Sequence, residues 1–347
     1  MNWFKKKPQK PTPPKITCHH CFEIFDNHRI LFKGKRPKAL DPDFFHPQDM
    51  GYTDDVLTSL LEEDGHITTQ RICPYCHKPL HPQAGFVASK TIILVGSKNT
   101  GKTTYLTSLI HYLKTVTPCH LPISISPIDN HTSQLFREKY EYQIIDKGEL
   151  LPATKITEAI QPPLAFTLST PMGPCRETNL IFLDLPGEGL FHNDYIHQYC
   201  PYLQAADGLI FLIDPLQIKT IGQKINFTNQ LEADLTKTPE PLDVLTCLLQ
   251  HNLPNIPLAI TLSKSDLLLP LQESGEYISG PDYNPEDFFK QVDPNFYNGL
   301  KMRFDHTAFF ALSALGKKPN GVRIASYAPM GVDQPLLWLL RQLDIAV

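Results

Sequence analysis

The sequence predicts an α/β fold, in which a mostly parallel sheet carries helices on both faces and follows a small cysteine-containing module. Three observations predict this fold: short apolar runs that alternate with helix-compatible stretches, a glycine-rich loop after the first run, and two CxxC pairs ahead of both. A chain of 347 residues with 41% hydrophobic residues can bury a full core. The runs expected as strands are TIILV (91–95), PLAFTLS (163–169), NLIFLDL (179–185), GLIFLID (208–214), IPLAITL (256–262) and TAFFALS (307–313).

Two neighbouring runs, 163–169 and 179–185, are joined by the short turn TPMGPCRET. Two parallel strands need a crossover of about a dozen residues or more, so this turn is too short to connect a parallel pair. We therefore expect the two runs to form an antiparallel hairpin. The predicted sheet is then mostly parallel with one antiparallel edge strand.

Composition divides the chain into three zones. Residues 1–15 are a flexible basic leader rich in proline and lysine, residues 16–85 form the cysteine-containing module, and residues 90–347 form the α/β domain. The stretch 267–293 is rich in glycine, proline and acidic residues, which predicts an insertion with at most short helices. No run reaches the roughly 18 apolar residues that cross a bilayer. A net charge of −4 gives no global attraction to nucleic acid or anionic membrane, so we expect a cytoplasmic protein without membrane insertion.

Residues 96–103, GSKNTGKT, match the phosphate-binding pattern GxxxxGK[ST] between a predicted strand and a predicted helix. Backbone N–H groups of such a loop point at phosphate oxygens, and its lysine reaches the β and γ phosphates. We expect Lys102 to be catalytic and the hydroxyl of Thr103 to bind magnesium. The expected nucleotide contacts are Gly96, Ser97, Lys98, Asn99, Thr100, Gly101, Lys102, Thr103 and Thr104.

The segment NLIFLDLPGEG places Asp184 at the end of an apolar strand and Gly187 three residues later. A carboxylate at this position can hold magnesium through water, and the Gly187 N–H can bind the γ-phosphate and release it after hydrolysis. Glu188 follows directly and is a catalytic candidate. Because a carboxylate accepts a proton or hydrogen bond but does not donate, we expect slow or differently arranged turnover.

A second loop, LPATKITEAIQPP, precedes the predicted hairpin and contains Thr154 and Thr157. Either hydroxyl can be the second threonine ligand of magnesium. We favour Thr154, also as a catalytic candidate, because Pro152 rigidifies the chain before it. Both threonines can instead cap a helix.

The segment SKSD, residues 263–266, follows the fifth apolar run and has nearly the form [NT]KxD. In that element the aspartate accepts hydrogen bonds from guanine N1 and N2 while the lysine stem covers the base, so SKSD favours guanine over adenine. Ser263 keeps a small hydroxyl able to brace the phosphate loop. The alternative is a capped turn after a buried strand. The expected base contacts are Ser263, Lys264 and Asp266, with Ser313, Ala314 and Leu315 after the last run.

Two CxxC pairs, in ITCHHCFEIF and RICPYCHKPL, provide four thiolates for a tetrahedral structural zinc. Redox-active or unligated thiols are the alternatives, and His19, His20 or His77 can replace one cysteine. A nearby basic run, Lys33 to Lys38, is short, so protein docking is favoured over nucleic acid. The remaining thiols are scattered, at Cys119, Cys175, Cys200 and Cys247. The four expected zinc ligands are Cys18, Cys21, Cys73 and Cys76, which makes residues 16–85 a zinc-ribbon-like module with an insertion.

The motifs GSKNTGKT, LPAT, DLPGE, SKSD and SAL, in this order, resemble the translation-factor and Ras-related (TRAFAC) class of P-loop GTPases over roughly residues 90–345. Within that class, the LPAT loop, the DLPGE switch and the closing GVDQPLLWLL helix resemble bacterial double-GTPase proteins of conflict or defence systems. The resemblance implies GTP and GDP as ligands and a nucleotide-controlled switch that works with partner proteins. Glu188 stands where many such GTPases carry a glutamine, and Ser263 where they carry asparagine or threonine.

Three functions compete on this basis. The leading one is a GTP-dependent switch, or slow GTPase, that acts on partner proteins. One alternative is an ATP-using P-loop enzyme in which SKSD is only a turn. The other is a non-hydrolysing scaffold, which binds nucleotide for stability while the zinc module recruits protein or nucleic acid.

Overall fold

The computed structural model describes residues 14–34, 44–47, 57–61, 65–152, 163–171, 176–185, 201–222, 239–250, 255–269 and 284–347. The chain divides into two compact units, the N-terminal unit Met1–Ser89 and the C-terminal unit Lys90–Val347.

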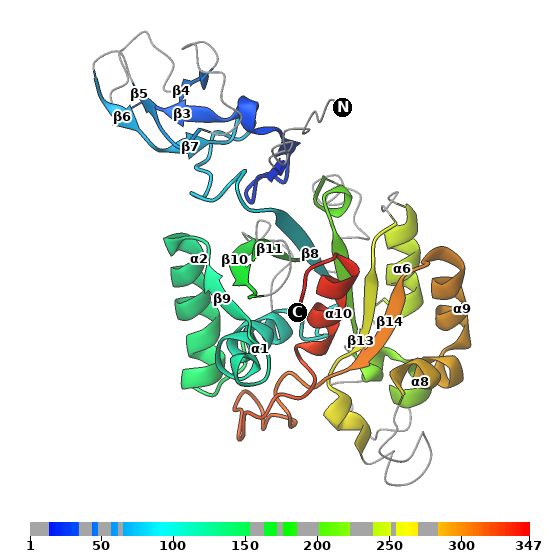
Figure 1. Cartoon of the computed structure of the whole chain (residues 1–347). Coiled ribbons are helices and arrows are strands. Elements are labelled where there is room, and N and C mark those ends of the chain that lie inside the picture. Colours follow the sequence, from blue (N-terminus) through cyan, green and yellow to red (C-terminus); the bar gives the residue numbers. More distant parts are fainter. Residues whose placement is uncertain are drawn as a thin grey trace, which may run out of the picture. The chain divides into compact units, whose positions relative to one another are not determined.

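The C-terminal unit is built on a seven-stranded sheet with the order β14-β13-β12-β8-β11-β10-β9 (Figure 1). The pairs β8–β12, β12–β13 and β13–β14 are parallel. Every residue of β12 and β13 is buried, as expected for parallel strands covered on both faces. The strands are β8 (Ser89–Val95), β9 (Ser124–Pro127), β10 (Leu164–Ser169), β11 (Glu177–Asp184), β12 (Gly208–Ile213), β13 (Leu258–Leu262) and β14 (Thr307–Ala311).

All six apolar runs form strands of this sheet, and the predicted hairpin is present as the antiparallel pair β10–β11. The structure adds one strand that the sequence did not predict. Strand β9 pairs antiparallel with β10, so β10 lies one position inside the sheet edge. The segment SISP of β9 has only one buried apolar residue, Ile125, which explains why no apolar run indicated it.

Helices cover both faces of the sheet. Ile210 and Leu212 of β12 belong to a core cluster with Leu109 and Leu336, which lie in two helices, whereas the Phe211 ring contacts a third helix on the other face. The main helices are α1 (Lys102–Thr115), α2 (Asn130–Leu135), α4 (Lys219–Gly222), α6 (Pro241–Gln250), α8 (Pro285–Val292), α9 (Pro294–Arg303), α10 (Gln334–Gln342) and the π-helix η4 (Phe136–Asp146). The 3-10 turns are η1 (Asn27–Arg29), η3 (Thr117–Cys119), η6 (Pro215–Gln217) and η7 (Ser265–Leu268).

Capping side chains begin several of these helices. Asp129 Oδ1 accepts from Thr132 N at 2.7 Å at the start of α2, and Asn284 and Asp293 cap α8 and α9 in the same way. Prolines occupy the first turns of α8, α9 and α10, where a missing N–H costs no helical hydrogen bond. None of the helices in the described part of the chain has the length and apolar character needed to cross a membrane.

Part of the predicted insertion 267–293 packs into the C-terminal unit. Helix α8 lies within it, and Phe288 and Phe289 of this helix are fully buried. The Phe289 ring contacts Phe309 of β14 at 5.7 Å between centroids. The end of this stretch therefore belongs to the helical layer beside β14, while residues 270–283 lie outside the described residues.

The described residues of the N-terminal unit form short strands, in the pairs β1–β2 and β5–β6 and the three-stranded sheet β4-β3-β7. Its core is correspondingly small and includes two of the cysteines. The strands are β1 (Ile16–Thr17), β2 (Ile24–Phe25), β3 (Leu31–Lys33), β4 (Phe44–Phe45), β5 (Leu60–Leu61), β6 (Ile67–Thr68) and β7 (Arg71–Ile72). The buried core cluster is Ile16, Cys18, Phe25, Ile30, Phe32, Leu60, Cys73, Leu80 and Ala84.

Candidate nucleotide site and metal centre

The phosphate loop joins the end of β8 to the start of α1 in a conformation that requires glycine at two points. Gly96 has φ +155°, and a Cβ there would lie 2.4 Å from the carbonyl oxygen of Leu212. Gly101 has φ +83° and caps α1, which begins at Lys102. The sequence therefore folds into a loop that ends on a helix N-terminus, where backbone N–H groups and the helix dipole favour an anion.

Side chains of the loop are arranged around its own backbone. Lys102 Nζ donates to the carbonyl oxygens of Gly96 and Ser97 at 2.8 and 3.0 Å, and the Thr100 hydroxyl donates to Ser97 O at 2.9 Å. Lys102 is buried, and these two hydrogen bonds hold its ammonium group against the loop that the sequence assigned to phosphates. Thr104, the last predicted contact, lies in the first turn of α1.

The two predicted magnesium ligands that the structure describes meet directly. Thr103 Oγ1 of α1 donates to Asp184 Oδ2, at the end of β11, over 2.5 Å, although 81 residues separate them in the chain. They line a pocket together with Leu106, Thr107, Tyr140, Leu164 and Phe182. Thr154, Thr157, Gly187 and Glu188 lie outside the described residues.

A hydroxyl and a carboxylate at one point fit magnesium, which takes oxygen ligands and keeps several waters. The site presents these donors beside the mouth of the phosphate loop, where a nucleotide phosphate can complete the coordination. The residues present therefore suit the metal that the motifs imply, with Thr103 and Asp184 as the groups that would hold it.

The segment 263–266 connects strand β13 to the phosphate loop through its lysine. Lys264 Nζ donates to Asn99 O and to Asp214 Oδ2, each at 2.6 Å. The Ser263 hydroxyl donates to Ile213 O at 3.1 Å, in the neighbouring strand β12. The contact with the loop, which the sequence assigned to Ser263, is therefore made by Lys264, because the short serine side chain faces β12.

The aspartate of this segment is joined to the element after the last strand. Asp266 Oδ1 accepts a hydrogen bond from the Ser313 hydroxyl at 2.6 Å, and Ser313 Oγ accepts from Gly316 N at 2.8 Å. Ala314 O accepts from the Ser108 hydroxyl of α1 at 2.8 Å, and Leu315 O accepts from Ala328 N. The structure thus brings the two predicted base elements, SKSD and Ser313–Leu315, to one place.

Sequence reasoning missed two residues of the turn after β12. Asp214 is 1% exposed and pairs with Lys264, and the Gln217 amide donates to Lys98 O at 2.9 Å. A signal for Asp214 existed in the sequence. A buried aspartate that directly ends a fully apolar strand needs a charged or hydrogen-bonding partner, and Lys264 supplies it.

The loop 316–330, which follows the second base element, was also not predicted. Gly316 has φ +86°, and a Cβ there would lie 2.0 Å from Ala328 O. Further along, Ile324 N donates to Gly148 O and Leu150 N donates to Val322 O, each at 2.7 Å. The loop therefore pairs with residues 148–150, close in sequence to the predicted Thr154 loop.

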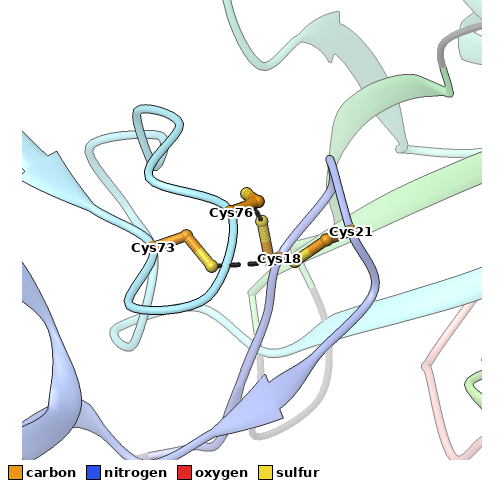
Figure 2. A group of neighbouring side chains, drawn as sticks. All are labelled: Cys18, Cys21, Cys73 and Cys76. Carbon is orange, nitrogen blue, oxygen red and sulfur yellow. Dashed lines mark hydrogen bonds between the residues drawn. The ribbon is translucent and has the colours of Figure 1, made fainter.

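The four predicted zinc ligands converge in the N-terminal unit. Figure 2 shows Cys18 and Cys21 on one loop and Cys73 and Cys76 on another, with their side chains directed toward one another. Their sulfur atoms all lie within 4.8 Å of one another, and the Cys18–Cys76 and Cys21–Cys73 sulfur pairs are 3.8 and 3.7 Å apart. The group contains no histidine, so the four-cysteine prediction describes it better than the alternatives with His19, His20 or His77.

The two CxxC loops have the same backbone geometry. Cys18 O accepts from Phe22 N and Cys73 O accepts from His77 N, and both donor residues have positive φ, 62° and 55°. Backbone N–H groups also donate to the first sulfur of each loop, from His20 to Cys18 and from Tyr75, each at 3.4 Å. These bonds orient the sulfur atoms and favour their charged form.

The thiol chemistry of this group suits a soft divalent cation. The hydrogen bond between Cys18 and Cys21 lowers the pKa of the Cys21 thiol and raises the pKa of Cys18, so Cys21 is the thiol of this pair that ionises more readily. Four sulfur donors within 4.8 Å of one another match the ligand set of structural zinc. The residues present therefore fit a zinc ion held by Cys18, Cys21, Cys73 and Cys76.

The strand order, the GSKNTGKT loop between β8 and α1, and the SKSD segment beside it define a P-loop domain of the GTPase fold. The chain belongs to the Double-GTPase 2 family, which matches residues 90–325, and family and fold together support a GTP-binding protein.

Known proteins similar to this chain include one curated bacterial relative. This relative is the putative ESX-1 scaffolding and assembly protein SaeC of Mycolicibacterium smegmatis, to which the chain is 30% identical over 207 residues. The match covers 58% of this chain and 52% of that protein, so the chain spans about half of the relative's length. Among solved structures, the Trypanosoma brucei Arl6 small GTPase with a bound nucleotide analogue is 15% identical, with TM-score 0.31, over 74% of this chain and 98% of that chain. A bacterial selenocysteine-specific elongation factor is 14% identical, with TM-score 0.32, over 74% of this chain and 29% of that chain.

Proposed function

We propose that this protein is a cytoplasmic GTP-hydrolysing molecular switch that controls partner proteins in a multi-component bacterial system of the defence or conflict type. The observation that carries the proposal is the meeting of Thr103 and Asp184 at 2.5 Å beside the phosphate loop. Two residues from distant motifs are brought together where a metal-bound triphosphate would be held and where a γ-phosphate would be sensed. Membership of the Double-GTPase 2 family supports this assignment.

The chain's own groups divide the work on the triphosphate. The loop backbone from Gly96 to Gly101 surrounds the β-phosphate, and Lys102 leaves its carbonyl partners to neutralise charge on the β and γ oxygens. Thr103 and Asp184 would hold magnesium, which would supply charge neutralisation to the triphosphate. Glu188 is assigned to orienting the attacking water as a proton or hydrogen-bond acceptor, and because a carboxylate does not donate, we expect turnover to be slow.

Guanine selectivity is assigned to Asp266. Its Oδ1 is held by the Ser313 hydroxyl at 2.6 Å, which fixes the carboxylate plane. A carboxylate fixed in this way accepts from guanine N1 and N2, whereas adenine presents an acceptor at N1 and is rejected. The stem of Lys264 covers one face of the base, and the backbone of Ala314 and Leu315 approaches guanine O6.

Two observations support action on partner proteins, one from the curated relative and one from the N-terminal unit. The curated relative is described as a scaffolding and assembly protein, which supports action on other proteins rather than on a small molecule. The N-terminal unit carries exposed apolar side chains, among them Ile67 at 66% and Leu61 at 52% exposure, paired across β5 and β6. A small zinc module of this kind suits protein docking.

Binding of fluorescent GTP, GDP and ATP to the wild type and to Asp266→Ala, each with magnesium, tests the guanine assignment. We expect the wild type to prefer guanine nucleotides and Asp266→Ala to bind them about 10- to 100-fold more weakly, as expected for lost hydrogen bonds to a charged acceptor. Asp287→Ala, which removes a surface carboxylate paired with Lys290 on α8, is the matched control. Equal affinity of ATP and GTP for the wild type would identify an ATP-using enzyme instead.

Single-turnover hydrolysis tests the enzymatic part separately. We expect Lys102→Ala to lower the hydrolysis rate by about a hundredfold or more, since the lysine meets charge that grows in the transition state. A wild-type rate in Glu188→Ala would remove that residue from the mechanism. Tight GTP binding without any hydrolysis in the wild type would favour the nucleotide-stabilised scaffold.

A further inference from the structure

The turn that follows β12 contacts the phosphate loop at two separate points. Gln217 donates directly to the carbonyl oxygen of Lys98 at 2.9 Å. The second contact is indirect and reaches Asn99, the next residue of the loop. Lys264 Nζ donates to both Asp214 Oδ2 and Asn99 O at 2.6 Å, so the lysine connects Asp214 to the loop. The turn therefore contacts the loop backbone both directly and through the lysine of the base element.

Asp214 is held more firmly than a surface carboxylate. Its side chain is 1% exposed, and its Oδ1 accepts from Leu216 N at 3.0 Å within the same turn. Only Oδ2 then faces Lys264, whose side chain is 37% exposed. A buried carboxylate with one fixed oxygen gives the lysine ammonium a single defined position, and a charge-assisted bond of this length is among the stronger hydrogen bonds in proteins.

Lys264 itself needs this support. Its backbone has φ +50°, a left-handed conformation that is uncommon for a residue other than glycine. That conformation directs the long side chain from the end of β13 toward the phosphate loop, where a flexible four-carbon stem would otherwise sample many rotamers. The contact with Asp214 selects one of them.

We propose that Asp214 is a positioning residue for guanine-nucleotide binding, which fixes Lys264 in the one arrangement that covers the base and holds the phosphate loop at Asn99. The inference rests on the proposed function, since it assumes that the site binds a guanine nucleotide. Asp214 does not touch the nucleotide and acts only through Lys264. It therefore links base recognition to the geometry of the phosphate loop.

Dissociation of fluorescent GDP from the full chain with magnesium tests this in a double-mutant cycle of Asp214→Asn and Lys264→Met. Asparagine keeps the acceptor for Leu216 N but removes the charge that holds the lysine. We expect each single variant to release GDP about tenfold or more faster than the wild type. Because Asp214 acts through Lys264, we expect the double variant to match Lys264→Met within about twofold.

A second cycle provides the matched control. Gln217→Ala removes the direct contact with Lys98 O, which does not involve Lys264. We expect its effect and that of Lys264→Met to multiply, as for independent contacts. Asp214→Ser, which retains an acceptor for Leu216 N, replaces Asp214→Asn in the first cycle if thermal unfolding shows that the asparagine variant is not folded.

The outcomes distinguish a failure of the positioning role of Asp214 from a failure of the proposed guanine-nucleotide binding. If wild type binds GDP and the Asp214 and Lys264 effects multiply, Asp214 has a merely structural role and the inference is wrong. An Asp214 variant that is folded and releases GDP at the wild-type rate also overturns it. If the wild type binds no guanine nucleotide, the proposed function is wrong, and the positioning role that assumes such binding is wrong with it.

Discussion

The two units of this chain reach a folded state by different means. In the C-terminal unit, a continuous cluster of buried aliphatic and aromatic side chains fills the space between the sheet and its helices. In the N-terminal unit, the described strands are two or three residues long, and Cys18 and Cys73 are members of the small core. The C-terminal unit is stabilised by buried apolar area, and we expect the N-terminal unit to depend on a metal held by its four sulfur atoms.

This difference shows how many sequence positions a buried parallel sheet and a tetracysteine centre each constrain. A parallel sheet needs long apolar runs, which is why β12 and β13 are buried throughout. A tetracysteine centre needs four residues at fixed spacing and two loops of matching backbone shape, and the sequence between the loops is then free to vary. The units should accordingly respond to different perturbations.

The largest expected effect is the loss of the N-terminal unit when its metal centre is broken. We expect Cys73→Ser to abolish zinc binding and to unfold this unit, because structural zinc contributes on the order of 10 kcal/mol to such modules. Mass spectrometry of bound zinc and hydrogen exchange of peptides from residues 65–85 provide the measurement. Peptides from β8 and α1 should keep their protection.

Cys119→Ser is the control for this experiment, since Cys119 is an exposed thiol outside the sulfur group. It should leave zinc content and exchange unchanged. Retained protection of residues 65–85 in zinc-free Cys73→Ser would show that the small apolar core suffices. The contrast between the two units would then be wrong.

The second largest effect concerns the core of the C-terminal unit. Phe166 of β10 is fully buried, and its ring contacts those of Phe136 and Phe182. We expect Phe166→Ala to lower the free energy of unfolding of this unit by about 3–5 kcal/mol. Denaturant unfolding of this unit, monitored through the loss of guanine-nucleotide binding, measures the change in free energy. The zinc content should stay at the wild-type level.

Met302→Ala, at a side chain that is 83% exposed, is the matched control and should change this free energy by less than about 0.5 kcal/mol. A Phe166→Ala protein that also loses its zinc would contradict independent stabilisation of the two units.

Much of the fold was predictable because its signals are local. Each apolar run became a strand, and the nine-residue turn between two of them allowed only a hairpin. Strand β9 was not predictable in this way, because SISP has one buried apolar residue and owes its pairing to β10. Edge strands of this kind are defined by their neighbour and not by their own pattern.

Some residues of the candidate site were likewise predictable from local motifs, and others were not. Motif spacing predicted that Thr103 and Asp184 would serve one metal and that Asp266 and Ser313 would each contact the base, and the structure places the two residues of each pair within hydrogen-bond distance. The pairing of Lys264 with Asp214 depends on how β12 and β13 align in space, and no spacing in the sequence encodes it. Roles that act through a neighbouring strand, such as the contact of Ser263 with Ile213, need the register of the sheet.

The smallest expected effect tests how far the sheet edge relies on local structure. Asp129 Oδ1 accepts from Thr132 N at 2.7 Å and begins α2, a six-residue helix that packs on β9 and β10. We expect Asp129→Ala to cost about 1 kcal/mol, and Asp129→Asn, which keeps the acceptor, to cost much less. Hydrogen exchange of residues 124–135 measures the change. Because the central strands are held by the core, the loss should appear as local opening of β9 and α2, with nucleotide affinity unchanged. If instead the whole C-terminal unit loses protection equally, the edge and the central sheet form one cooperative unit, and the weak sequence signal of β9 does not reflect weak local stability.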